Sequence, residues 1–174
     1  MNHDCYSDAY IRDILVSNRT IAMVGASANQ SRPSYFAMKY LMTKGFRVIP
    51  VNPGQAAHAI LGEKVYAALA DIEEKVDIVD IFRNSRAALA ITREAIRIAA
   101  KVVWMQLGVR NDEAAKIAED AGLKVVMNRC PKIEYGRLSG ELNWAGVNSQ
   151  MLSSRRQILG AKGVQHRVLK ASGE

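Results

Sequence analysis

Short apolar segments alternate with amphipathic segments along this 174-residue chain, and this alternation restricts the fold more than any other feature. The apolar segments have the length of strands and lie at 20–25, 46–51, 77–82, 102–107 and 123–127. Apolar strands that are separated by helices are typical of a parallel sheet covered on each side. We therefore predict an α/β fold with a doubly wound, mainly parallel sheet of five or six strands and helices on both faces. Because proline lacks an N–H, Pro50 predicts that pairing of the second strand stops early.

The intervening segments have helical spacing and recognisable ends. One helix over 33–44 begins at a proline, a second covers about 86–100, and a third begins after Asn111 and ends at Gly122. An amphipathic helix over about 7–16 is expected to pack outside the sheet. Within 62–72 we expect one short strand at 64–66 and one helical turn.

The composition agrees with a single globular domain, since 49% of residues are hydrophobic and 24% are charged. We assign residues 1–150 to this domain and residues 151–174 to a basic C-terminal tail. Of the net charge of +7, +4 belongs to that tail and +3 to the rest. The charge therefore does not indicate a nucleic-acid-binding protein.

The sequence also restricts the cellular compartment. Two cysteines are too few for a disulfide framework, and the N-terminus lacks the apolar core of a signal peptide. The uncharged stretches are shorter than the roughly 20 residues that cross a bilayer. We therefore expect a cytoplasmic protein without a membrane partner.

Small, polar and turn residues follow each predicted strand, and parallel strands bring these loops to one edge, where ligands bind. The loop after the first strand is suited to a phosphate. Gly25 allows close backbone approach, Ser27 and Asn29 carry hydrogen-bonding groups, and the helix that begins at Pro33 directs free amides into the loop. Arg32 can add a charge-assisted contact.

Motif tests restrict the class of ligand. The loop has one glycine where G-x-G-x-x-G has three, and it lacks the G-K-[ST] of a P-loop. The second strand ends in Asn52 and Pro53, without the acidic residue that holds the ribose of NAD. An ordinary turn capped by Ser31 is the alternative, but we favour a phosphate-bearing ligand other than a nicotinamide cofactor.

Candidates for catalysis are few. The histidines are His3, His58 and His166. None has a Ser or Cys partner that the sequence places nearby, so we expect them to be exposed to solvent. The candidates for a carboxylate pair are Glu73, Glu74, Asp77 and Asp80, although a solvated edge and a strand end explain them equally. Zinc-ligand spacing is missing, and we predict neither catalytic residues nor a metal site.

Cys130 follows the last strand at the predicted ligand edge, between Arg129 and Lys132. Neighbouring cations favour a thiolate and therefore reactivity. A half-buried, unreactive thiol before a proline turn is the other interpretation, and both stay open. The reactive thiol leads to an alternative function, a small Rossmann-type enzyme that uses a nucleotide cofactor and Cys130.

Six segments together resemble the small stand-alone CoA-binding proteins, which are similar to the CoA-binding domain of the succinyl-CoA synthetase alpha subunit. The segments are VGAS…RPSY, VIPVNPG, ILGEKVY, VDIVDIFR, WMQLGV and NRCPKIEY, within about residues 7–141. The resemblance implies a Rossmann-like fold that binds coenzyme A or an acyl-CoA at the carboxyl edge of the sheet.

The resemblance also implies where the ligand contacts lie. The first loop meets the pyrophosphate, the second-strand turn lies beside the adenosine, and the later loops border the rest of the ligand. In chain order, these contacts are Gly25, Ala26, Ser27, Asn29, Arg32, Pro33, Asn52, Pro53, Ile81, Phe82, Arg83, Gln106, Gly108 and Cys130. Cys130 and Glu134 match a C-x-x-x-E motif that has no assigned role.

The chain departs from the synthetase at two points. The synthetase has a lysine after the second-strand turn, where this chain has Gln55, so the 3′-phosphate would need Arg32 or Arg83. The second domain, which carries the phosphorylated histidine of the synthetase, is also missing from these 174 residues. We therefore expect binding of coenzyme A, or of a closely related adenine nucleotide, without ligase activity or other catalysis. A homo-oligomer or an unidentified protein partner stays open, including an acidic partner bound through Arg155 and Arg156.

Overall fold

The computed structural model describes residues 2–56 and 58–141, so the predicted tail at 151–174 lies outside the described residues. Five parallel strands form one sheet in the order β2-β1-β5-β6-β7. They are β1 (Thr20–Val24), β2 (Arg47–Val51), β5 (Ile78–Ile81), β6 (Val102–Met105) and β7 (Lys124–Val126). The predicted α/β, Rossmann-like fold is confirmed, and each of the five predicted strands is present.

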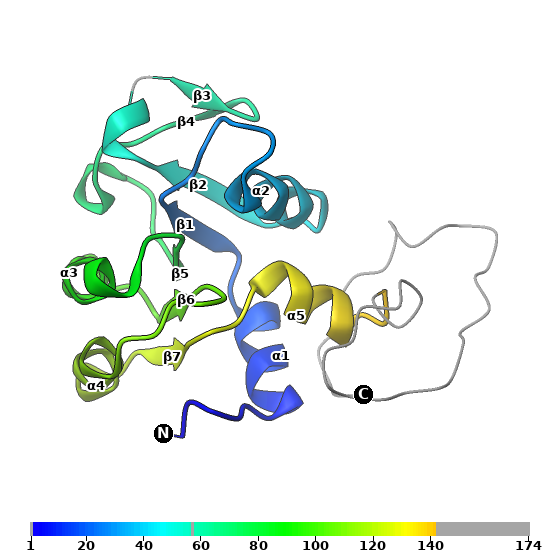
Figure 1. The fold of residues 1–174 in the computed structure, drawn as a ribbon, viewed down its shortest axis with the longest axis vertical. Helices are drawn as coiled ribbons and strands as arrows, with labels where there is room; N and C mark the ends of the chain where they lie inside the picture. Colours follow the sequence, from blue (N-terminus) through cyan, green and yellow to red (C-terminus); the bar gives the residue numbers. More distant parts are fainter. Residues whose placement is uncertain (1, 57, 142–174) are drawn as a thin grey trace.

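Helices cover both faces of this sheet. Figure 1 shows α3 (Ser85–Arg97) and α4 (Asp112–Asp120) on one face, with α1 (Asp8–Ser17), α2 (Pro33–Thr43) and α5 (Pro131–Leu138) on the other. Side chains alternate between the faces along each strand. Met23 and Trp104 belong to the core under α1, α2 and α5, whereas Ala22 and Val103 belong to the core under α3 and α4.

Local sequence signals explain where several helices begin. The predicted cap Asn111 accepts a hydrogen bond from the backbone N–H of Ala114 at 2.8 Å, and Asn84 caps α3 in the same way. Ser7 caps α1, which buries its apolar stripe against the sheet. The α5 helix was not expected, although Pro131 occupies its first turn, where proline is favourable.

The outer edge of β2 corrects the expectation for Pro50. This residue pairs in register with Met23, and the strand continues to Val51. The carbonyl oxygen of Pro50 accepts from the N–H of Tyr66 at 3.0 Å, and the carbonyl oxygen of Tyr66 accepts from Asn52 at 2.9 Å. Since β2 is the edge strand, the missing N–H of Pro50 faces away from β1 and the pairing inside the sheet is intact.

Two tyrosines lie along the opposite edge, at β7. The hydroxyl of Tyr10 donates to the carbonyl oxygen of Val125 at 3.2 Å and accepts from the N–H of Val125 at 3.1 Å. The hydroxyl of Tyr6 accepts from the N–H of Met127 at 2.8 Å. Side chains of the N-terminal segment therefore make the hydrogen bonds that a further strand would make.

The segment between β2 and β5 is built of short pieces. A 3-10 turn, η1 (Pro53–Gln55), precedes an antiparallel hairpin of β3 (Ala59–Ile60) and β4 (Glu63–Lys64). The strand expected at 64–66 is therefore shorter, and Tyr66 makes an isolated parallel bridge to Val51. The predicted helical turn is the 3-10 turn η2 (Leu69–Asp71).

Candidate functional site

The strand order brings the predicted loops to one edge of the sheet. The chain reverses direction across the sheet between β1 and β5, because β2 lies on one side of β1 and β5 on the other. The helix that follows β1 covers one face and the helix that follows β5 covers the opposite face (Figure 1). This is the topological switch point at which open α/β sheets bind ligands.

Gly25 fixes how closely the loops after β1 and β5 approach each other. Its φ is +93°, a region that favours glycine. A Cβ at this position would lie 2.9 Å from the carbonyl oxygen of Phe82 and 2.9 Å from Cδ of Arg83. The absence of a side chain at Gly25 therefore allows these two loops to meet through their backbone, while the predicted approach of a phosphate to Gly25 stays a prediction.

Polar side chains of the first loop are used to shape the loop itself. Oδ1 of Asn29 accepts from the N–H and the hydroxyl of Ser31, at 2.9 and 2.7 Å, and Oγ of Ser27 accepts from the N–H of Asn29 at 3.2 Å. These bonds form a compact turn ahead of α2. Ser31 is not the cap of α2, because Arg32 occupies that position and makes no capping hydrogen bond with its side chain.

The second loop is tied to the first. Nδ2 of Asn52 donates to the carbonyl oxygen of Ala26 at 2.7 Å, and its Oδ1 accepts from the N–H of Gly54 at 3.0 Å. Oε1 of Gln55 accepts from the N–H of Ala28 at 3.0 Å. Asn52 therefore holds the loops together, and Gln55 takes part in the same contact although it carries no charge.

The start of α2 has the properties of an anion-binding site. Pro33 occupies the first turn, and the first amides of a helix have no partner within the helix. These amides and the helix dipole favour a negative charge. Arg32 and Arg83 are exposed, and within the described residues neither guanidinium forms an ion pair.

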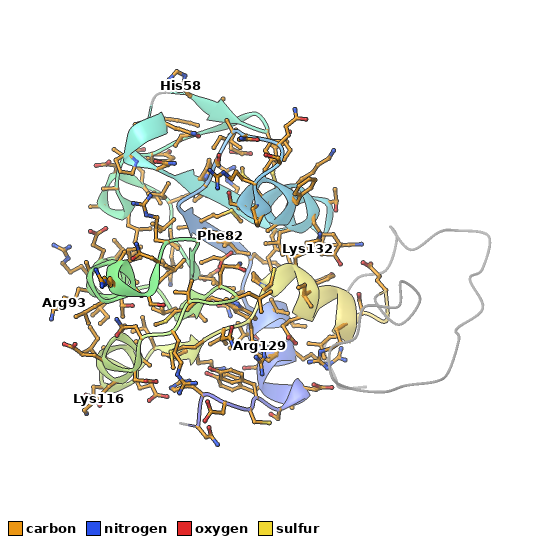
Figure 2. The ribbon with its side chains drawn as sticks, viewed as in Figure 1. His58, Phe82, Arg93, Lys116, Arg129 and Lys132 are labelled. Atoms are coloured by element: carbon orange, nitrogen blue, oxygen red, sulfur yellow. The ribbon has the colours of Figure 1, made fainter. Side chains whose placement is uncertain are left out.

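A pocket of about 560 Å³ lies beside this helix start, among the ends of β5 and β6 and the start of α5. Its walls are mainly apolar, and the side chains of Phe36 and Leu107, which line it, are 52% and 56% exposed. Figure 2 shows Phe82 and Lys132, which also line the pocket, on the side of the sheet that carries α2 and α5. Exposed large apolar side chains beside a pocket are typical of a binding site.

Asp80 and Gln106 lie below this pocket. Asp80 is completely buried, and Nε2 of Gln106 donates to both of its carboxyl oxygens, at 2.9 and 3.1 Å. Burial raises the pKa of Asp80 to about 8, although the hydrogen bond from Gln106 acts in the opposite direction. Asp77 lies at the other end of β5, where it accepts from the N–H groups of Arg19 and Thr20, so the carboxylate pair is not formed.

Cys130 lines the pocket and precedes α5. Burial raises the pKa of its thiol, and the nearby charge of Asp80 acts in the same direction. Backbone N–H groups of α5 and the charge of Lys132 oppose this shift but do not reverse it. The structure therefore favours the interpretation of a half-buried, protonated thiol over that of a thiolate.

Arg129 is occupied by contacts within the protein. Its guanidinium lies 5.7 Å from the ring centroid of Tyr6, and its Nε lies 3.8 Å from Glu134. Glu134 is buried and accepts from Nε and Nη2 of Arg137 at 3.1 and 2.8 Å. The glutamate of the C-x-x-x-E motif is therefore bonded within α5, and its partner Arg137 also forms an ion pair with Asp8 of α1 at 2.8 Å.

The structure brings five of the fourteen predicted contacts together at the pocket and corrects one expectation. These five are Pro33, Phe82, Arg83, Gln106 and Cys130. Gly108 lies beside the pocket, in a loop that its N–H ties to Oδ1 of Asn128 at 2.9 Å. The prediction for Ile81 is wrong for its side chain, which is completely buried in the core under α3 and α4.

Other expectations concerned histidines and metal sites. His58 is exposed at the far end of the molecule from the pocket, as Figure 2 shows. The side chain of His3 is only 8% exposed, because its ring packs against Tyr6 and lies 3.4 Å from Glu119, so the expectation of solvent exposure is wrong. Within residues 2–56 and 58–141, no three His, Cys, Asp or Glu side chains are arranged to hold a metal ion.

Sequence reasoning missed five apolar walls of the pocket: Phe36, Ala37, Leu107, Val109 and Ile133. Their side chains come from three different elements, and a list of loop residues does not reveal which of them converge. One signal was available, because Phe36 interrupts the helical spacing of apolar residues in α2. A large apolar side chain on the exposed side of a helix indicates a contact with something outside the core.

The fold and the site together define a Rossmann-like α/β protein with an open ligand edge. The family described as CoA binding domain matches residues 19–136, and the chain belongs to this family. The chain is 34% identical over 129 residues to the uncharacterized protein YneT of Bacillus subtilis (strain 168), across 74% of this chain and 94% of YneT.

Solved structures share this fold. A hypothetical protein from Pyrococcus horikoshii OT3 is 40% identical, has a TM-score of 0.74 and matches 79% of this chain and 96% of its own. A protein from Thermus thermophilus, cell-free ID.343, is 38% identical, has a TM-score of 0.73 and matches 76% of this chain and 99% of its own. Within the described residues, none of the helices is long and apolar enough to cross a membrane.

Proposed function

We propose that this protein binds coenzyme A, or a closely related adenine nucleotide, at the carboxyl edge of the sheet. The phosphates would lie at the first loop and the start of α2, with Arg32 and Arg83 beside them. The pantetheine arm would lie along the apolar pocket. The observation that carries this proposal is the continuity between a helix start suited to phosphate and an apolar pocket, since Pro33 and Arg83 line the pocket.

We further infer that the protein acts without catalysis, as a carrier, a sensor or a regulatory subunit in the cytoplasm. The raised pKa of Cys130 supports this proposal, because a protonated, half-buried thiol is a poor nucleophile. Alkylation of Cys130 at neutral pH should therefore be no faster than that of a free thiol. Rapid alkylation would favour the alternative of an enzyme that uses Cys130.

Thermal unfolding in the presence of ligands tests the binding proposal. Coenzyme A, dephospho-coenzyme A, ADP and NAD are compared at concentrations from 10 μM to 1 mM (roughly bracketing common cofactor affinities). A ligand that binds only the folded state adds about 2.7 kcal/mol at a hundredfold excess over its Kd. Stabilisation by coenzyme A is expected, and stabilisation by NAD without any by coenzyme A would refute the proposal.

Arginine variants test the placement of the phosphates. Arg83→Ala should weaken coenzyme A about tenfold, because an exposed charge-assisted contact to phosphate is lost. Arg93→Ala is the matched control, since Arg93 is exposed on α3, on the opposite face of the sheet (Figure 2). Equal affinities of the two variants would place the phosphates elsewhere.

A further inference from the structure

Asp80 is a carboxyl group in the middle of a strand that is otherwise apolar. Val79 and Ile81 face the core under α3 and α4, so the alternation of the strand directs Asp80 to the face that carries α2 and α5. Its neighbours in register are Met23 on β1 and Trp104 on β6, neither of which is ionisable. Burying a carboxyl group among such neighbours is costly, because it loses its hydration.

Gln106 is the group that connects Asp80 to the pocket. Gln106 is 6% exposed and lines the pocket, while its Nε2 donates to both oxygens of Asp80. No hydrogen bond to its Oε1 is made by the residues that the structure describes. Because the carboxylate of Asp80 binds Nε2 of Gln106 on the core side, Oε1 of the same carboxamide is directed away from Asp80 and toward the pocket.

The pocket restricts what can meet this oxygen. Its walls are mainly apolar, and the exposed side chains of Phe36 and Leu107 would be covered by an occupant. Arg83 at its border attracts the anionic end of a ligand. The occupant is therefore a mainly apolar arm that carries a hydrogen-bond donor and is attached to phosphates, a description that fits the amides and thiol of pantetheine.

We propose that Asp80 is a positioning residue that holds the carboxamide of Gln106. Held in this way, Oε1 of Gln106 accepts a hydrogen bond from an amide N–H or the thiol S–H of the ligand arm. This proposal rests on the proposed function. Gln106 would contact the ligand, and Asp80 would act only through Gln106. A buried polar acceptor of this kind selects against a ligand that offers no donor, because the acceptor would then stay unpaired.

The charge of Asp80 decides how the carboxamide is held. An ionised carboxylate only accepts, so it keeps Nε2 of Gln106 inward and Oε1 toward the pocket. A protonated carboxyl also donates, and Oε1 of Gln106 is the adjacent acceptor, which would turn the nitrogen toward the pocket. Since the pKa of Asp80 is about 8, this change falls between pH 7 and pH 9.

Other ionisable groups near the site are few and can be controlled. Cys130 before α5 is electrostatically coupled to Asp80. Arg83 lines the pocket from the loop after β5, and Lys132 lines it from α5. The lining residues contributed by the α2 region are Ser31, Pro33, Phe36 and Ala37, which carry no charge. Cys130→Ser therefore removes the titratable neighbour while Asp80 and Gln106 remain.

Isothermal titration with two probes tests the direct contact. Coenzyme A carries the arm, and adenosine 3′,5′-bisphosphate lacks it. Gln106→Met should weaken coenzyme A about tenfold, the worth of one hydrogen bond to a buried acceptor, and leave the bisphosphate unchanged. An equal loss for both probes, or none for coenzyme A, would overturn the assignment of Gln106.

A double-mutant cycle tests whether Asp80 acts through Gln106. At pH 9, where Asp80 is ionised, Asp80→Asn should weaken coenzyme A in the wild-type background, because an amide at position 80 holds either orientation of Gln106. In the Gln106→Met background the same substitution should have no further effect. Additive losses would show an independent role for Asp80 and refute the proposal, and circular dichroism confirms that each variant is folded.

The pH profile separates positioning from a structural role. From pH 7 to pH 9, the affinity for coenzyme A relative to the bisphosphate should rise in the wild type and in Cys130→Ser, and stay flat in Asp80→Asn. The thiol of coenzyme A titrates alike for every variant, so the difference between variants is the readout. The same profile in Asp80→Asn as in the wild type would refute the role of Asp80, whereas a wild type that binds no coenzyme A would refute the proposed function itself.

Discussion

At the scale of single residues, Asp80 links the stability of the fold to pH. Its pKa is about 8 in the folded protein because of burial, whereas an ordinary aspartate titrates near 3.8. Between these two values the folded state binds a proton that the unfolded state has released. The contribution of Asp80 to the free energy of unfolding therefore falls as pH rises, by up to about 1.4 kcal/mol per pH unit.

Asp80→Asn should remove this dependence. Relative to the wild type, the variant should gain stability as pH rises from 5 to 8, and the gain should level off above about pH 8. Urea denaturation at each pH gives the difference in free energy of unfolding. Asp120→Asn is the control, since Asp120 is exposed on α4. Its difference from the wild type in free energy of unfolding should not change with pH in this range. A constant difference for Asp80→Asn would mean that Asp80 is ionised throughout and would contradict the prediction.

Gly25 is the residue at which the backbone leaves no space for a side chain. Gly25→Ala combines a positive φ with a contact of 2.9 Å to the carbonyl oxygen of Phe82, so it should cost about 2–4 kcal/mol. Gly45→Ala is a matched control, because Gly45 has a φ of +85° but no atom within 4 Å of the added Cβ. Gly45→Ala should cost only about 1–2 kcal/mol, from backbone strain alone. Denaturant midpoints measure both costs, and equal costs would show that the loops after β1 and β5 separate easily.

At the scale of elements, Glu141, which lies just beyond the end of α5 at Leu138, ties this helix to α2. Lys44 and Tyr40 both donate to the buried carboxylate of Glu141, at 2.5 and 2.6 Å. Lys44 is also buried, so the ion pair is shielded from solvent on both sides. The two helices that border the pocket are therefore held relative to each other by a buried charged cluster.

Glu141→Gln should loosen this connection. Glu141→Gln removes the negative charge that lies 2.5 Å from Nζ of Lys44 in this buried pair, and the expected loss of stability is about 3 kcal/mol. The exposed i, i+4 pair of Lys116 and Asp120 is the comparison, where Asp120→Asn should cost less than about 0.5 kcal/mol. Urea denaturation compares the two variants, and a cost for Glu141→Gln as small as that of the surface pair would contradict the structural role of Glu141.

The elements also show which sequence signals were sufficient. Five strands and four helices followed from runs of apolar residues and from caps such as Asn111, because these signals are local. The α5 helix was missed because its segment contains Gly136 and lacks a clear apolar stripe, and packing against α1 and α2 stabilises it instead. The expectation for Pro50 was wrong because the effect of a proline on strand pairing depends on whether its strand lies at the edge of the sheet. The local sequence does not show that β2 is an edge strand.

At the scale of the whole molecule, the sequence predicted which edge of the sheet carries the site. It did not predict which side chains line the pocket there. Loop composition and the resemblance both indicated the carboxyl ends of the strands, and Pro33, Phe82 and Gln106 do meet there. Ile81 was assigned to the ligand because Ile81, Phe82 and Arg83 match the segment that borders the ligand in the family the chain resembles, but neighbouring strand residues face opposite sides. Which side chains converge depends on the register and twist of the complete sheet, and these are not encoded at any one position.

The charge of the molecule is also best understood at this scale. Arg129 was expected to share the ligand edge with Arg32 and Arg83, but it is engaged by Glu134 and by the ring of Tyr6. Two arginines near the first loop therefore remain for an anionic ligand. The net charge of +7 says little about function, because the local distribution of unpaired cations is what a phosphate would meet.

The two edges of the sheet have a consequence for self-association. An exposed edge strand is a template on which another chain can add a strand, and this is a common route to aggregation. At β2 the outward position of Pro50 offers no N–H, and Tyr66 already bonds to its carbonyl oxygen. At β7 the hydroxyls of Tyr6 and Tyr10 already bond to the outward N–H groups of Met127 and Val125. A strand added at these positions would meet groups that are missing or already bonded, so we expect any homo-oligomer of this domain to assemble through its helices or loops.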